Sequence, residues 1–160
     1  MQKIAVVAMM VALGACSGSR APTTAPGAAP DFNRGTVLID TDGESVLFYA
    51  FVAESAEQPR FAVMHEGTLP DNKGVVFLYF EPASRAFQLK ETAVPLSIAL
   101  FDVDGRITET SDVEPCGATG GPCSQHDPGT EYMGALVVND GAFERLGVAA
   151  GDVVEIVPGS

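Results

Sequence analysis

Positive charge is scarce in this sequence. Nine lysine and arginine residues stand against 21 aspartate and glutamate residues, so the formal net charge is −12 at pH 7. A chain this acidic is repelled by the phosphates of nucleic acid and by anionic lipid headgroups. The composition therefore argues against nucleic acid as a partner.

The amino-terminal apolar run is too short to cross a membrane. It follows Lys3 and covers only residues 4–13, whereas a spanning helix needs about 20 apolar residues. A basic start, a short apolar run and small residues are typical of a signal peptide, which we expect at residues 1–15. The ending "LGAC" is similar to the bacterial lipobox, in which the cysteine, here Cys16, is acylated and becomes the first residue.

The segment that follows lacks the apolar side chains needed to fold. Residues 17–30 are Ser, Gly, Ala, Thr and Pro, with Arg20 as the one charge, which is the composition of a disordered linker. Stable anchoring takes two or three acyl chains, at about 0.8 kcal/mol per buried methylene. We expect residues 16–30 to be a lipidated cysteine and tether that join residues 31–160, a single β-rich globular domain, to a bacterial membrane. The predicted location is extracytoplasmic, on a periplasmic or cell-surface face.

Cysteine is also rare, with three residues in the chain. If Cys16 carries the lipid, Cys116 and Cys123 remain as an even pair in a compartment where thiols are oxidised. We expect a disulfide across the loop "EPCGATGGPC", which would contribute about 2.5 kcal/mol in the chain-entropy model. The alternatives are a zinc site with His126 and Asp127 as further ligands, or free or redox-active thiols.

The sequence lacks the recognised motifs of catalysis and cofactor binding. It has no Gly-x-Ser-x-Gly nucleophile motif and no lysine–serine or lysine–threonine pair after a glycine-rich loop. A serine–histidine–aspartate triad could be drawn with either histidine, but serines and aspartates are too plentiful for this to mean much. We predict no catalytic residues, no metal and no cofactor. Four aspartates could be read as calcium ligands, but the twelve-residue calcium loop is absent. We therefore interpret them as turn residues: Asp40, Asp42, Asp102 and Asp104.

Short β-rich segments separated by turns fill the folded region. Asp-Gly pairs at 42–43 and 104–105 each stand between β-branched and aromatic runs, which is a strong hairpin signal. Residues 74–80, "GVVFLYF", are apolar throughout and predict a central strand. Further strands are expected at residues 85–91, 131–138 and 152–157, and a short helix with an Asn/Asp cap is expected before Gly147.

This pattern predicts a mainly β fold. Seven or so short strands with one or two short helices favour a small β-barrel-like domain, which is a β-rich α+β class. Strand spacing alone accounts for the aromatic side chains, which we expect to alternate between core and surface: Phe48, Tyr49, Phe51, Phe77, Tyr79, Phe80 and Phe101.

Four blocks of the sequence resemble a known family. They are, in order, "AVMHEGTLPDNKGVVFLYF", "FQLKETAVPLSIALFDVDGRI", the loop with its two Pro-Cys pairs, and "ERLGVAAGDVVEIV". Together they are similar to the bacterial and archaeal family called domain of unknown function 192, over roughly residues 50–157. The resemblance implies a compact β-barrel-like fold and no established activity.

The central motif of that family is only partly kept. It usually runs Phe-Trp-Met-Lys-Asn-Thr, then an apolar residue, then Pro-Leu-Asp. This chain retains Phe87, Lys90, Thr92, Pro95 and Leu96. The tryptophan, methionine, asparagine and aspartate are replaced by Gln88, Leu89, Glu91 and Ser97.

The resemblance implies candidate ligand-binding residues at Phe87, Lys90 and Thr92. Lys90 could bind an anionic ligand or pair with a carboxylate. It could equally extend along an exposed strand face with its ammonium group in water.

These observations favour a non-enzymatic binding or accessory module at the cell envelope. Its expected partners are the membrane, through Cys16, and an unknown envelope protein or small ligand. One alternative is a small envelope hydrolase or other enzyme with a pocket near Lys90 and Thr92. Another is a metal-responsive domain at Cys116, Cys123 and His126.

Overall fold

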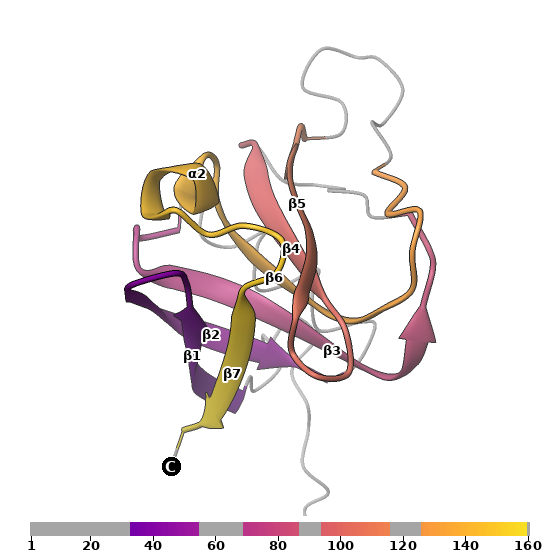
Figure 1. Cartoon of the computed structure of the whole chain (residues 1–160), viewed down its shortest axis with the longest axis horizontal. Coiled ribbons are helices and arrows are strands. Elements are labelled where there is room, and N and C mark those ends of the chain that lie inside the picture. The colour runs from indigo at the N-terminus through magenta and orange to yellow at the C-terminus, as the bar shows by residue number, and fades with distance from the viewer. Residues whose placement is uncertain (1–32, 55–68, 87–93, 116–125, 160) are drawn as a thin grey trace, which may run out of the picture.

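The computed structural model describes residues 33–54, 69–86, 94–115 and 126–159 (Figure 1). Seven strands and one short helix lie within these ranges, so the expectation of a mainly β fold is confirmed. The elements are β1 (Asn33–Asp40), β2 (Ser45–Ala53), β3 (Lys73–Ala83), β4 (Leu96–Phe101), β5 (Ile107–Val113), β6 (Tyr132–Asn139), α2 (Ala142–Leu146) and β7 (Val153–Pro158).

The two expected hairpins are present. β1 and β2 are joined by a turn in which the backbone N–H of Thr41 donates to the carbonyl of Glu44 at 3.0 Å. β4 and β5 are joined by residues 102–106, where Oδ1 of Asp102 accepts from the N–H groups of Asp104 (3.0 Å) and Arg106 (2.9 Å). An aspartate that binds the backbone two and four residues on is acting as a turn residue, as we predicted.

The strands form one sheet in the order β5-β4-β6-β3-β2-β1-β7. All neighbours are antiparallel except β2 and β3, which are parallel. β3 has β6 on one side and β2 on the other, so the prediction of a central strand at residues 74–80 is confirmed. The strand expected at residues 85–91 falls largely outside the described residues.

The middle of the sheet is buried on both faces. Every residue of β4 is buried, and so are most residues of β6. Side chains on one face, including Val76, Ala99 and Leu136, pack with α2, β1, β2 and β7 in what we call the inner core. Side chains on the other face, including Val75 and Ile98, form a second apolar cluster. The aromatic residues alternate as expected: Phe48, Phe77 and Phe101 are buried, whereas Tyr49 and Phe80 are exposed.

The sheet curls, in keeping with a barrel-like domain, but it does not close into a barrel. Its end strands, β5 and β7, meet only where each of them begins. There the N–H of Val154 donates to the carbonyl of Gly105 (2.7 Å), and the N–H of Ile107 donates to the carbonyl of Asp152 (2.8 Å). We call this contact, between residues 105–107 and residues 151–154, the clasp. Figure 1 shows β7 at the front of the molecule, between β1 and the β4–β5 hairpin.

The short helix α2 ends as predicted but does not begin as predicted. Gly147, in the left-handed conformation (φ 69°), stops it. The expected Asn/Asp cap is wrong, since Gly141 occupies the cap position and no side chain caps the helix end. Asn139 instead lies at the end of β6, where its amide donates to the carbonyl of Leu69. No helix in the described ranges is long and apolar enough to cross a membrane.

The clasp depends on a glycine at position 105. Gly105 has φ 76°, and a Cβ there would overlap the carbonyl oxygen of Val154. We expect Gly105→Ala to lower the free energy of unfolding by about 2–4 kcal/mol, from the left-handed backbone and the clash together. Gly129→Ala is the matched control, because Gly129 has φ 62° with nothing nearby, and should cost about 1 kcal/mol. Urea unfolding of both variants measures the difference, and equal losses would show that the approach of β7 is unimportant.

Candidate functional site

Apart from His126 and Asp127, the residues that the sequence analysis selected for function lie outside the described part of the chain. Lipidation, the disulfide and the family-derived ligand site therefore stay predictions. The residues concerned are Cys16, Phe87, Lys90, Thr92, Cys116 and Cys123.

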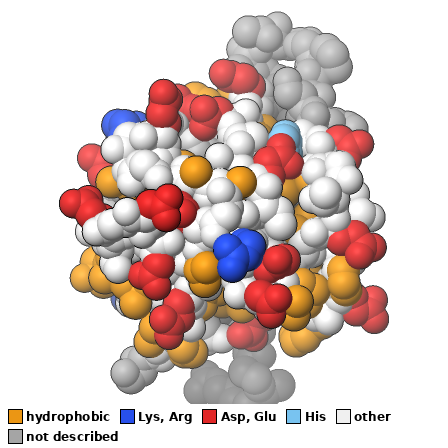
Figure 2. Space-filling view, viewed as in Figure 1, with side chains coloured by type: hydrophobic (Ala, Val, Ile, Leu, Met, Phe, Trp, Pro, Cys, Tyr) orange, Lys and Arg blue, Asp and Glu red, His pale blue; other side chains and the backbone are white. Residues whose placement is uncertain are grey.

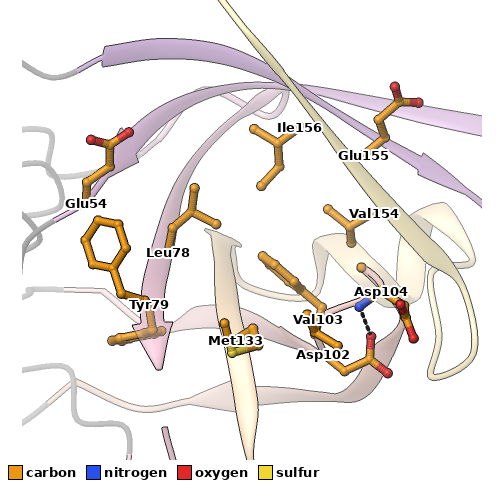
Figure 3. A pocket seen from close by; sticks show the side chains of 13 residues that line it. Glu54, Leu78, Tyr79, Asp102, Val103, Asp104, Met133, Val154, Glu155 and Ile156 are labelled. Atoms are coloured by element: carbon orange, nitrogen blue, oxygen red, sulfur yellow. Dashed lines mark hydrogen bonds between the residues drawn. The ribbon is translucent and has the colours of Figure 1, made fainter. Parts of the chain in front are cut away.

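The structure shows a groove that sequence reasoning missed. It has a volume of about 570 Å³ and lies at the open end of the inner core, beside the clasp (Figure 3). Strands β3, β6 and β7 and the β4–β5 turn contribute its walls. The lining residues are Glu54, Leu78, Tyr79, Phe80, Phe101, Asp102, Val103, Asp104, Gly105, Met133, Val154, Glu155 and Ile156.

The floor of the groove is apolar because it is continuous with the inner core. Phe101 and Val154 are members of that core, and Leu78 and Ile156 pack against it. The ring of Phe101 occupies the space that a side chain at position 134 would need, since a Cβ on Gly134 would overlap the ring. Apolar side chains at the end of a core offer a surface that is partly screened from water.

Two side chains extend this apolar surface into solvent. Phe80 is 88% exposed and Val103 is 77% exposed, the two highest values among the exposed large hydrophobic residues that the structure describes. Phe80 follows the buried part of β3, and Val103 lies in the β4–β5 turn between two aspartates. A valine at the tip of an acidic turn is a signal that could have been noticed in the sequence.

Among the described residues, the charged groups that line the groove are carboxylates, from Glu54, Asp102, Asp104 and Glu155. Figure 3 shows Glu54 at one side of the opening and the other three at the opposite side. Arg106 follows the turn, but its guanidinium donates to the carbonyl of Gly151 at 2.7 Å. Carboxylates are also spread over the face shown in Figure 2, with few basic groups among them.

The phenol that lines the groove belongs to a pair of tyrosines. The rings of Tyr79 and Tyr132 meet edge to face at 5.5 Å, and the guanidinium of Arg85 lies 5.5 Å from the centre of the Tyr79 ring. Burial raises the pKa of Tyr79, and burial with the nearby Tyr79 raises the pKa of Tyr132 to about 12. Both phenols are therefore protonated and uncharged at neutral pH, so neither serves as a base.

Ser97, at the family's aspartate position, is buried in a polar contact on the sheet. Its hydroxyl donates to Oδ1 of Asp112, which lies opposite it on β5. The same hydroxyl accepts from the N–H of Gly141, just before α2, at 2.8 Å. A carboxylate is thus present next to this position, but it comes from the neighbouring strand.

His126 lies on the β5 side of the molecule and does not line the groove. Its Nε2 is 2.9 Å from Oε1 of Glu109 and 3.1 Å from Oγ of Ser111. A serine–histidine–carboxylate relay needs the two partners on opposite ring nitrogens. Because both contacts use Nε2, this arrangement attaches the histidine to β5 and does not activate the serine.

The groove combines apolar side chains with carboxylates and a phenol. Among the described residues that line it there is no serine, threonine, cysteine, histidine or lysine, so its carboxylates and the Tyr79 phenol are the groups of nucleophilic type. Within the described ranges no cluster of three or more histidine, cysteine or acidic residues could hold a metal ion. An apolar floor with a few polar groups at its edge is the common form of a ligand pocket.

Comparison with known proteins places the chain among uncharacterised relatives. Residues 37–156 match the family DUF192, which is described as "Uncharacterized ACR". A comparison with curated proteins finds no match.

Two crystal structures share the fold. One is a candidate transcription regulator from Sinorhizobium meliloti 1021, with a TM-score of 0.70 and 21% identity over 79% of this chain and 96% of that one. The other is a protein of unknown function from Novosphingobium aromaticivorans DSM 12444, with a TM-score of 0.68 and 23% identity over 86% and 94%. At these identities the likeness establishes the fold alone.

The contact between Ser97 and Asp112 can be tested by exchanging the two residues. We expect Ser97→Asp alone to lower the free energy of unfolding by about 2 kcal/mol, because a carboxylate would then be buried at position 97 next to the carboxylate of Asp112. Adding Asp112→Ser should restore most of the loss, since a single carboxylate and a hydroxyl are again paired.

Chemical denaturation of the parent, both single variants and the double variant gives the coupling free energy. If the losses in unfolding free energy of the two single variants simply add in the double variant, the two residues are not coupled and the prediction is wrong.

Proposed function

Because the chain belongs to the uncharacterised DUF192 family, we propose its function from the groove: it is a non-enzymatic binding module held at a bacterial membrane by lipid on Cys16. The observation that carries the binding role is an open apolar groove whose lining offers carboxylates and an uncharged phenol but no activated nucleophile. The lipobox-like sequence and the tether support the location.

The anchor and the groove serve the same purpose in this proposal. Residues 16–30, which have the composition of a linker, would serve as a tether that holds the domain close to the membrane. Tethering raises the effective concentration of a binding surface near other envelope components. A weak groove can then capture a partner that it would miss in free solution.

Direct binding to nucleic acid is not part of the proposal. The net charge of −12 opposes contact with a phosphate backbone. The description of the Sinorhizobium meliloti protein as a candidate transcription regulator is therefore not carried over to this chain.

The anchor is tested by Cys16→Ser. We expect the parent protein to sediment with membranes and to have an intact mass that begins at an acylated Cys16, because several acyl chains are needed for stable retention. The variant should lose both properties. Cys116→Ser is the control and should stay in the membrane fraction, whereas parent protein found unacylated would remove the anchor from the proposal.

The groove is tested with Nile red, an uncharged apolar dye. The double substitution Phe80→Ser/Val103→Ser should weaken dye binding several-fold, because it removes the exposed apolar surface at the mouth of the groove. Leu146→Ser, which changes an exposed leucine on α2, is the matched control and should leave binding unchanged. Fluorescence titration measures all three, and equal dye binding by the groove variant would rule out the groove as a binding surface.

A further inference from the structure

The chemistry of the groove restricts what it can bind. Four carboxylates stand on its rim, and the part of the lining that the structure describes includes no lysine or arginine. Fatty acids, nucleotides and anionic headgroups would bring like charge to this opening, in a chain whose net charge is already −12. A ligand that complements the groove carries positive charge beside apolar groups.

The edge of β7 adds a second recognition element. Val154 directs its N–H away from β1 and toward Gly105 in the clasp. In a strand, residues two apart present their backbone groups on the same side, so Ile156 directs its N–H and C=O toward the groove. The β4–β5 turn extends no further along β7, and within the described ranges β7 pairs on this side only through the clasp.

An open strand edge beside an apolar groove is the arrangement that binds extended peptides. The added chain bonds to the free backbone groups of the edge, and its alternate side chains enter neighbouring pockets. Residues of an extended peptide point alternately to opposite sides. In a peptide whose basic and apolar residues alternate, the apolar side chains would therefore face the floor and the basic side chains would face the rim.

We propose that the groove binds an extended segment of a partner polypeptide in which lysine or arginine alternates with apolar residues. The apolar side chains lie against Leu78, Phe101 and Ile156, and the basic ones face Asp104 and Glu155. The peptide backbone pairs with the β7 edge at Ile156. This inference rests on the proposed binding function and specifies its ligand.

The probe is a fluorescein-labelled hexapeptide that alternates lysine with leucine or phenylalanine, titrated by fluorescence anisotropy against the intact domain. Binding should be saturable and should weaken as salt is added. The double reversal Asp104→Lys/Glu155→Lys should weaken it about tenfold, as expected for removing two attractive contacts and adding two repulsive ones. The double reversal Glu44→Lys/Glu144→Lys, at two exposed carboxylates that do not line the groove, is the charge-matched control and should change affinity less than about twofold. Thermal unfolding of each variant confirms that it is folded.

Two control peptides decide between alternation and simple attraction. A peptide with glutamate in place of lysine should not bind, and one with the same composition but all lysines grouped at one end should bind more weakly. If either binds as tightly as the alternating peptide, the assignment is wrong. Dimerisation of the unliganded domain through this groove, seen by sedimentation and abolished by Phe80→Ser/Val103→Ser, would also overturn it, because the occupant would then be a second copy.

The dye and peptide titrations together distinguish a failure of the peptide assignment from a failure of the proposed binding function. If Nile red binds in the groove but the alternating peptide does not, the groove remains a binding surface and only the peptide assignment fails. If the substitutions at Phe80 and Val103 leave Nile red binding unchanged, the groove itself is not a binding surface and both fail.

Discussion

The clasp between the β4–β5 turn and the start of β7 decides the form of this domain. Three backbone hydrogen bonds join residues 105–107 to residues 151–154, and the guanidinium of Arg106 adds a bond to the carbonyl of Gly151. Through these contacts the two ends of a seven-stranded sheet are brought together at one point. The curl that results lets β1, β2 and β7 enclose an apolar interior with β3, β4 and β6. Without the clasp, β7 would be held by β1 alone.

The same contact explains why the domain has a groove at all. A sheet whose end strands paired along their full length would form a closed barrel, and its interior would be filled by side chains. Here the pairing stops after Gly105, so the interior opens between β3 and β7 and its apolar side chains reach the surface. The acidic rim follows from the turn, because the aspartates that suit its backbone geometry also place carboxylates at the opening. Fold and binding surface therefore have one structural origin.

Local sequence signals predicted the elements better than they predicted their assembly. The Asp-Gly pairs identified both hairpins, the apolar run identified β3, and Gly147 identified the end of α2. The start of α2 was missed because the N–H of Gly141 is satisfied by Ser97, a distant residue on the sheet, which no local capping rule can foresee. The groove was missed for a similar reason, since it arises from the long-range pairing of β7. The candidate residues Phe87, Lys90 and Thr92 came from the family motif and lie outside the described residues.

The pairing of β1 with β7 also has a consequence for the order of events during biosynthesis. These strands come from opposite ends of the folded region, and the sheet cannot be completed until the carboxyl-terminal one has been made. Contacts between residues so distant in sequence form slowly, because a large loop must close first. A nascent chain of this topology stays open for longer than one built from local contacts. If the chain is exported, as we propose, that delay would keep it unfolded until its last strand has been made.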